Sequence, residues 1–173
     1  MKIRSASFVV LCLFVATAAF TGEPDGKRHT WCEVGGSWFA AGDSAPWTAS
    51  FTETSFAGGF LITQWTGGDG DWYGYCDGSV RITNGMGSWS RKGPLAILYT
   101  IITFSLDADG EVVCIWKASG RIQLDASCDS GRQSGSIELF DPGTDPFTDE
   151  PFHWFPPDGE TEFVRMTVDP CRE

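Results

Sequence analysis

Hydrophobic residues in the middle of this chain follow the pattern of a β-hairpin. Residues 96–106 are apolar on both faces and rich in β-branched and aromatic side chains, which favours a strand over a buried helix. Residues 107–110 (Asp-Ala-Asp-Gly) are typical of a turn, because the glycine can adopt positive φ. Residues 111–124 then alternate between apolar and polar side chains, with Cys114 and Trp116 on the apolar side. This pattern predicts a return strand with one buried and one solvated face.

Similar short apolar or alternating segments, bounded by Gly, Asp and Pro, recur along the rest of the chain. The predicted strands cover residues 36–41, 47–54, 59–65, 72–83, 87–91, 96–106, 111–124, 134–140 and 160–168. No segment after residue 30 shows sustained helical periodicity. Many strands without crossover helices predict an all-β domain, and we expect an antiparallel up-and-down β-barrel of about eight strands. A jelly-roll β-sandwich is the alternative.

The first residues have a different character, which is that of a secretory signal peptide. Lys2 and Arg4 form a short positive region, residues 8–14 are apolar, and residues 16–18 (Ala-Thr-Ala) supply small side chains for cleavage. The apolar run is too short for a membrane-spanning helix, which needs about 20 residues. We therefore expect residues 1–18 to be removed and the protein to be secreted, either to the periplasm or outside the cell, without a membrane span.

Removal of this segment changes the charge and the boundaries of the folded part. The whole chain of 173 residues carries 12 Lys and Arg against 23 Asp and Glu, and loss of Lys2 and Arg4 takes its net charge from −11 to −13. Scattered basic residues in so acidic a chain argue against binding to nucleic acid. Residues 19–30 have little hydrophobic pattern and are expected to be a flexible lead-in. Residues 31–173 are expected to form a single β-barrel domain.

Export would also reduce the number of cysteines that can form disulfides from six to five, because Cys12 lies within the signal segment. The remaining cysteines are Cys32, Cys76, Cys114, Cys128 and Cys171. Disulfides persist in an oxidising compartment, and an odd number leaves at least one thiol free or paired with another molecule. No two of these cysteines have C-x-x-C spacing and the chain has two histidines, so a structural zinc site is not expected. No cofactor is expected either.

Residues 36–38 (Gly-Ser-Trp) resemble the Gly-x-Trp element that begins the first strand of lipocalins and related calycin barrels. The resemblance implies that Trp38 closes one end of a barrel. It also implies that a basic residue of the last strand, here Arg165, packs across the indole. A guanidinium can lie flat on an indole face and still donate hydrogen bonds to nearby carbonyls.

Several further segments resemble a group of small secreted bacterial proteins that are described as lipocalin-like and have no assigned function. These segments are residues 87–94, 107–110, 120–124 and 140–142, and the resemblance covers most of residues 35–168. It implies the barrel fold but no catalytic residues.

The implied Trp38–Arg165 contact leads to a disulfide prediction. If these two residues lie opposite each other in an antiparallel ladder, Cys32 and Cys171 also lie opposite each other. Cys32 precedes Trp38 by six residues, and Cys171 follows Arg165 by six residues. We therefore expect a Cys32–Cys171 disulfide between the first and last strands. The pattern gives no pairing for Cys76, Cys114 and Cys128; Cys114 is expected to be a buried thiol.

Five aromatic residues on predicted strands could line the lumen of such a barrel. They are Trp47, Phe51, Trp65, Tyr99 and Trp116. An eight-stranded barrel either fills its interior with side chains or holds one small ligand. The favoured function is non-catalytic binding of a small apolar ligand in or at the mouth of the barrel. A solid-core structural or interaction protein is one alternative.

Two further alternatives are a carbohydrate-binding domain, which needs several aromatic rings exposed together, and a cyclase or dirigent-like enzyme on the same barrel. His153 is the one candidate catalytic base in the domain, within an aromatic stretch (residues 151–157) that we expect to be a loop. The weakest candidates are four acids that could bind calcium: Asp141, Asp145, Asp149 and Glu150. We expect a proline-rich acidic loop without a metal.

Overall fold

A computed structural model describes residues 31–41, 47–55, 57–65, 73–157 and 159–166. The predicted signal peptide, the lead-in and Cys171 lie outside these residues. The strands are β1 (Gly36–Ala41), β2 (Trp47–Ser55), β3 (Gly58–Trp65), β4 (Arg81–Ile82), β5 (Gly85–Gly93), β6 (Ala96–Leu106), β7 (Val112–Leu124), β8 (Ser130–Phe140), β9 (His153–Phe155) and β10 (Thr161–Arg165). One 3-10 helix, η1 (Tyr73–Tyr75), precedes β4. Among the described residues, no helix has the length and apolar character that crossing a membrane requires.

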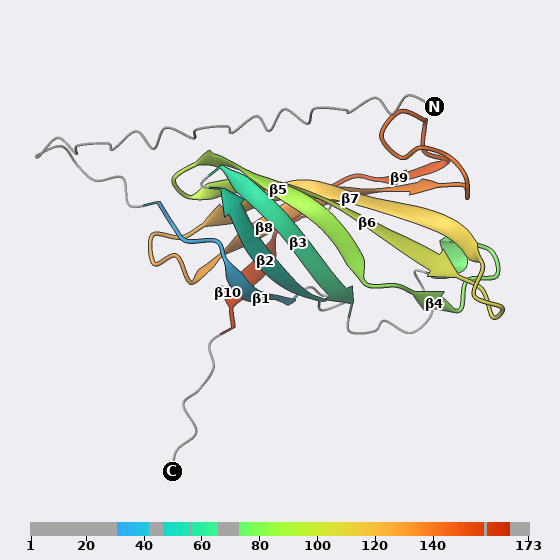
Figure 1. Cartoon of the computed structure of the whole chain (residues 1–173), viewed down its shortest axis with the longest axis horizontal. Helices are drawn as coiled ribbons and strands as arrows, with labels where there is room; N and C mark the ends of the chain where they lie inside the picture. The colour runs from blue at the N-terminus through green and yellow to red at the C-terminus, as the bar shows by residue number, and fades with distance from the viewer. Residues whose placement is uncertain (1–30, 42–46, 56, 66–72, 158, 167–173) are drawn as a thin grey trace, which may run out of the picture.

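Eight of these strands close into an antiparallel up-and-down barrel. Strands β1, β2, β3, β5, β6, β7 and β8 follow one another around the sheet, and β10 pairs with both β1 and β8 (Figure 1). The prediction of an all-β up-and-down barrel is therefore confirmed, and the jelly-roll alternative is wrong.

The two remaining strands extend the sheet beyond the closed barrel. Strand β4 pairs with the end of β6, and β9 pairs with the end of β8. The far ends of β6, β7 and β8 thus form a projecting sheet with β4 and β9 beside it (Figure 1). A second hydrophobic cluster lies in this part, formed by Cys76, Cys114, Trp116 and Leu139.

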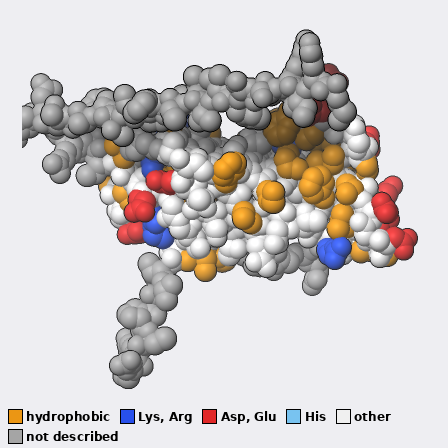
Figure 2. Space-filling model, in the orientation of Figure 1, with side chains coloured by type: hydrophobic (Ala, Val, Ile, Leu, Met, Phe, Trp, Pro, Cys, Tyr) orange, Lys and Arg blue, Asp and Glu red, His pale blue; other side chains and the backbone are white. Residues whose placement is uncertain are grey.

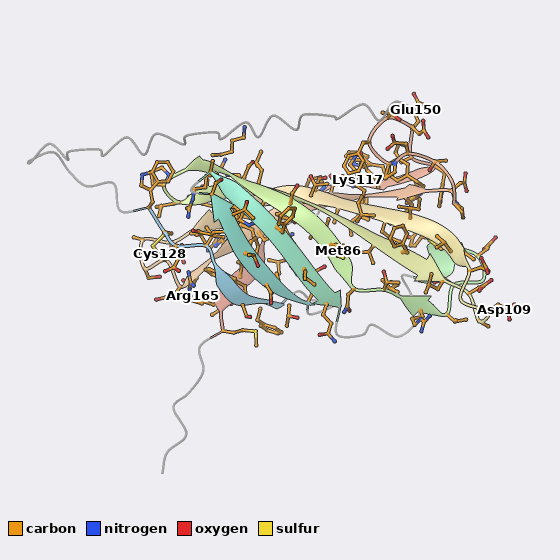
Figure 3. All side chains as sticks on the ribbon, in the orientation of Figure 1. Met86, Asp109, Lys117, Cys128, Glu150 and Arg165 are labelled. Atoms are coloured by element: carbon orange, nitrogen blue, oxygen red, sulfur yellow. A yellow bond between two sulfur atoms is a disulfide. The ribbon has the colours of Figure 1, made fainter. Side chains whose placement is uncertain are left out.

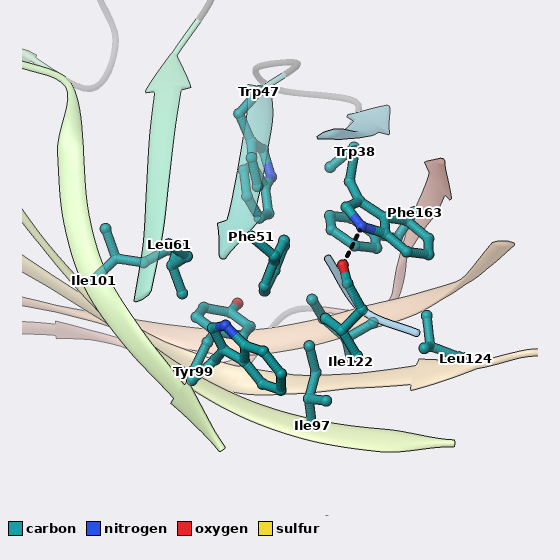
Figure 4. Packing of buried hydrophobic residues seen from close by; sticks show 14 of the residues in the cluster. Trp38, Trp47, Phe51, Leu61, Ile97, Tyr99, Ile101, Ile122, Leu124 and Phe163 are labelled. Carbon is teal, nitrogen blue, oxygen red and sulfur yellow. Dashed lines mark hydrogen bonds between the residues drawn. The ribbon is translucent and has the colours of Figure 1, made fainter. Parts of the chain in front are cut away.

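Aromatic rings fill the core of the barrel (Figure 4). Trp38 stacks on Phe163 with the ring centroids 4.9 Å apart. Trp47 and Phe51 pack against the same Phe163 ring at 5.7 and 6.0 Å. The indole Nε1 of Trp38 donates a hydrogen bond of 2.9 Å to the carbonyl of Val34, so this buried polar group is satisfied.

Arg165 closes one end of the barrel, as the resemblance implied. Trp38 and Arg165 are direct partners in the β1–β10 ladder, and the guanidinium lies 4.5 Å from the indole centroid. Its Nη1 donates to the carbonyl of Gly35 at 2.8 Å, and its Nη2 donates to the carbonyl of Glu33. Its Nε forms an ion pair with Asp129 at 3.3 Å without hydrogen-bond geometry. One side chain therefore joins β10, β1, the segment before β1 and the β7–β8 turn.

The predicted Cys32–Cys171 disulfide is wrong, because Cys32 is bonded to Cys128 in the β7–β8 turn. The β1–β10 ladder that the prediction extended is correct at Trp38, but Trp38–Arg165 is its last pair, and β1 begins at Gly36, where φ is +114°. Cys32 then crosses the end of the barrel, where its backbone N–H donates to the carbonyl of Pro94 at 3.2 Å. The extrapolation failed because the ladder does not continue through the residues before β1.

The expectation of a free Cys114 thiol is also wrong, since Cys114 is bonded to Cys76 just after η1. This bond explains part of the largest error in the predicted strands. Residues 72–83 are not one strand: η1 and a turn, in which the Ser79 N–H donates to the Cys76 carbonyl at 3.0 Å, precede the two-residue β4. Tyr75 of this segment contacts Phe155 of β9, with the ring centroids 4.7 Å apart, instead of continuing a ladder.

The other boundaries agree more closely. The predicted strands at 36–41 and 96–106 match β1 and β6, and most others differ by one to four residues at an end. Strand β9 was missed, because its residues were expected to be a loop. Two proline residues follow it directly, and the pairing with β8 covers three residues only.

The disulfide pattern can be tested by peptide mapping without reduction. We expect linked peptides that contain Cys32 with Cys128 and Cys76 with Cys114. In the chain-entropy model a loop of about 100 residues is worth about 4–5 kcal/mol, so the double variant Cys32→Ser/Cys128→Ser should lose about that free energy of unfolding in urea. A Cys32–Cys171 peptide would contradict the pairing.

The Arg165 contact can be tested by urea unfolding of Arg165→Met. We expect the free energy of unfolding to fall by about 2–4 kcal/mol, because the substitution leaves the carbonyls of Gly35 and Glu33 without their donor and removes the cation–π contact. The matched control is Arg132→Met, whose guanidinium is exposed and pairs with Glu160 at 3.1 Å, and this variant should change stability by less than about 1 kcal/mol. Equal effects of the two variants would contradict the role of Arg165.

Candidate functional site

The structure brings together three of the five predicted lumen residues. Trp47, Phe51 and Tyr99 lie in the barrel core and are buried. Trp116 lies instead in the second cluster, where its Nε1 donates to the Ser105 Oγ at 2.7 Å. The backbone of Trp65 pairs with that of Trp47, but the side chain of Trp65 is outside the described part of the structure.

The three core residues pack against other rings and against small neighbours. The Tyr99 hydroxyl lies over two glycines that pair across β7 and β8, at 2.6 Å from an ideal Cβ on Gly120 and 2.7 Å from one on Gly135. A larger residue at either position would displace the phenol ring. This part of the lumen is therefore filled with protein side chains.

Burial also keeps the Tyr99 phenol neutral. Desolvation raises the pKa of Tyr99 to about 12, although the hydrogen bond from Gln133 Nε2 at 2.8 Å acts in the opposite direction. The amide therefore donates to a neutral hydroxyl within the barrel wall.

Buried hydroxyl groups gather at the end of the barrel opposite to Arg165. At this end β1, β3 and β6 finish and β2 and β10 begin. The buried polar side chains of the described residues are Thr63, Thr103 and Ser105. All three lie toward this end of β3 and β6.

Thr63 is the unusual member of this group, because its Oγ1 is fully buried and has no hydrogen-bond partner. Gly85, its partner in the β3–β5 ladder, makes room for it: an ideal Cβ on Gly85 would lie 2.4 Å from Thr63 Oγ1 and 2.7 Å from Thr103 Oγ1. A buried hydroxyl without a partner costs about 1–3 kcal/mol. Sequence reasoning missed it, since threonine is common in strands and nothing local marks an inward hydroxyl.

His153, the candidate base, is held between aromatic rings. It lies in β9 opposite Leu139, and its ring is 5.0 Å from that of Tyr75 and 4.4 Å from that of Phe155. Within the described residues no hydrogen bond joins it to another side chain, so no carboxylate orients it as a base. The arrangement is that of a packing residue.

Some of the four candidate calcium ligands already accept hydrogen bonds within their own loop. The Asp149 carboxylate accepts the Asp145 backbone N–H at 2.7 Å, and the Asp145 carboxylate accepts the Phe147 N–H at 2.9 Å. The carbonyl of Asp141 accepts a hydrogen bond from the Thr144 hydroxyl at 2.8 Å, and Glu150 is exposed on the same loop (Figure 3). Among the described residues, no three His, Cys, Asp or Glu side chains lie close enough to hold a metal ion.

Exposed aromatic rings surround β9, and the sequence analysis did not identify them as a group. They are Tyr75, Phe147, Phe152 and Trp154, with exposed fractions of 47, 69, 49 and 54%. The density of aromatic residues at 147–155 was a usable signal, but the exposure of each ring depends on which face of β9 it occupies. Figure 2 shows that hydrophobic side chains gather toward the β6 and β7 ends of the viewed face, whereas those over β3 and β5 are separated.

A polar recess of about 420 Å³ lies outside the barrel beside β8 and β10. Its lining residues are Asp125, Ser130, Gly131, Arg132, Glu160 and Glu162. Arg132 and Glu160 pair with each other in solvent, and the Ser130 hydroxyl donates to Asp125 at 2.8 Å. Four of the polar side chains that line the recess are therefore already paired with one another.

Comparison of this chain with models of protein families, with curated proteins and with solved structures finds no match. The function is therefore inferred from the geometry described above.

The buried Tyr99 predicts a change of stability at high pH. Its pKa is about 12 in the folded chain and about 10 when unfolded, so the unfolded state loses the phenol proton first and stability falls as the pH rises from 10 to 12. The loss should approach about 2–3 kcal/mol relative to Tyr99→Phe, measured by urea unfolding between pH 9 and 12. Parallel curves for the two proteins would show that Tyr99 is not the titrating group.

Proposed function

We propose that this protein is an exported, non-catalytic binding protein of the lipocalin-like type. In this proposal it holds a small, mainly apolar ligand with one polar group at the end of the barrel opposite to Arg165. The closed eight-stranded barrel and the Trp38–Arg165 closure support the lipocalin-like assignment. The signal-like residues 1–18 and two disulfides, which are compatible with an oxidising compartment, support export.

The unpartnered Thr63 hydroxyl is the observation that carries the proposed site. A polar group of a ligand could accept its proton or donate to its oxygen, and this would remove the cost of leaving it unpaired. Its surroundings are mainly apolar apart from the Thr103 hydroxyl, since Ile101 packs beside Gly85 and Leu61 lies two residues earlier on the inner face of β3. An apolar molecule with a single hydrogen-bonding group fits this chemistry.

The aromatic core limits where the ligand can lie. Because Trp47, Phe51 and Phe163 contact one another, the ligand rests on this cluster instead of penetrating it. The candidate base His153 is a packing residue of the projecting sheet and supports binding over catalysis. A solid-core structural protein is the competing function, and it predicts that no small molecule binds.

The Thr63→Val variant separates the two. The isosteric change removes the unpaired hydroxyl, so we expect the ligand-free protein to gain about 1–2 kcal/mol in free energy of unfolding. It should also bind the uncharged fluorescent probe N-phenyl-1-naphthylamine about tenfold more weakly, because the probe N–H loses its acceptor. Fluorescence titration and urea unfolding measure the two effects.

The matched control is Thr100→Val on the outer face of β6, where the hydroxyl lies 3.3 Å from that of Ser119. This variant should bind the probe as the wild type does. Native mass spectrometry of the exported protein should also detect a co-purified small molecule. No co-purified mass together with no probe binding would favour the solid-core function, and equal affinities of Thr63→Val and wild type would move the site away from Thr63.

A further inference from the structure

Three side chains form a row on the outer face of the projecting sheet. Lys117 of β7 pairs with Glu138 of β8, and Glu138 pairs with Trp154 of β9. Partners in an antiparallel ladder share a face, and their neighbours Trp116 and Leu139 are buried in the second cluster on the opposite face. Lys117, Glu138 and Trp154 therefore point outward together.

Lys117 fixes the acidic loop, residues 141–152, beside this row. Its Nζ pairs with the Glu138 carboxylate at 2.6 Å and donates to the Pro146 carbonyl at 3.0 Å. The same Nζ lies 5.7 Å from the centroid of Phe140 and 5.8 Å from that of Phe147. Figure 3 shows Lys117 below the loop that carries Glu150. The cation therefore anchors the loop and places Phe147 next to the ion pair.

Two aromatic rings thus flank the Lys117–Glu138 pair, and both are more than half exposed. Within the described residues Trp154 has no ring contact, and the ring of Phe147 lies 5.8 Å from Lys117 Nζ. Burying either ring fully would contribute about 1.5–3 kcal/mol to folding, yet the loop and β9 hold both toward solvent. Contiguous exposed apolar surface with polar groups around it is typical of an interaction site.

The chemistry of this surface selects the ligand. Aromatic planes stack on the C–H faces of sugar rings, and hydroxyl groups need both acceptors, such as Glu138, and donors, such as Lys117. The central ion pair has no net charge, whereas Asp141, Asp145, Asp149 and Glu150 make the surrounding loop acidic. Those acids and the net charge of −11 disfavour anions and a second copy of this chain.

We propose that Trp154, Phe147 and the Lys117–Glu138 pair form a binding site for neutral oligosaccharides, separate from the barrel mouth. Trp154 and Phe147 supply the stacking surfaces, and Glu138 and Lys117 bind hydroxyl groups between them. A basic peptide is the competing ligand, since it would use the acids of the loop and not the two rings.

Affinity electrophoresis of the disulfide-intact protein in gels that contain neutral β-glucan, xylan or chitosaccharide polymer tests the site. We expect retardation by at least one polymer and a Kd for the matching hexasaccharide that rises about tenfold in Trp154→Ala and about three- to tenfold in Phe147→Ala. Trp154→Phe, which keeps a flat ring, should recover most of the affinity. The matched control is Phe60→Ala on the outer face of β3, a ring that is 63% exposed and distant from this row in sequence and sheet order.

Three results would overturn the proposal. The first is no retardation in any of the three gels. The second is an equal affinity for Trp154→Ala, Phe60→Ala and wild type. The third is tight binding of hexalysine that depends on Asp145 and Asp149 but not on Trp154, which would assign the surface to basic peptides. Far-UV circular dichroism and unchanged binding of N-phenyl-1-naphthylamine establish that each variant is folded, so that failure here is distinguishable from failure of the barrel site.

Discussion

The contact between Arg165 and Trp38 is the constraint on which the barrel depends. A closed sheet requires its last strand to find its first, and β10 has only five residues with which to do so. The guanidinium adds to this short ladder by covering the indole and by binding carbonyls of the segment that precedes β1. The Cys32–Cys128 disulfide ties the same segment to the β7–β8 turn. One end of the barrel is therefore closed by contacts between segments that are distant in sequence. Bringing such segments together costs loop-closure entropy, and the contacts at this end must offset that cost.

The interior side chains of the barrel pack in order from this closed end. Trp38 and Phe163 stack beneath Arg165, and the next rings pack onto them, each beside a small residue of a neighbouring strand. Trp38 is paired with Ala49, and Tyr99 is paired with Gly120. Large and small side chains alternate in this way as they do in other small barrels. Thr63 Oγ1, one of the buried polar atoms without a hydrogen-bond partner, lies on β3, toward the end of the strand away from Arg165.

The sequence predicted what depends on regular periodicity. The alternation in β7, the apolar run of β6 and the partnership of Trp38 with Arg165 all follow from strands that continue a ladder. It failed where the chain leaves a ladder: before Gly36, where the register that placed Cys32 no longer applies, and around Cys76, whose segment forms η1 and a turn next to the Cys76–Cys114 bond. The outward row of Lys117, Glu138 and Trp154 joins three strands and needs the β8–β9 register, which a three-residue strand does not reveal in advance.

The two hydrophobic clusters explain how one small domain can support two separate surfaces. The barrel cluster is built around Phe163 and the closed end, whereas the second cluster is built around the Cys76–Cys114 disulfide and Trp116 on the projecting sheet. Strand β7 contributes to both clusters, and its ladders with β6 and β8 run without a break from the barrel into the projecting sheet. Because its inner face has its own packed and covalently linked core, its outer face can leave Trp154 and Phe147 in solvent without weakening the barrel. The stability that Arg165 provides and the recognition that we assign to Trp154 therefore rest on different contacts.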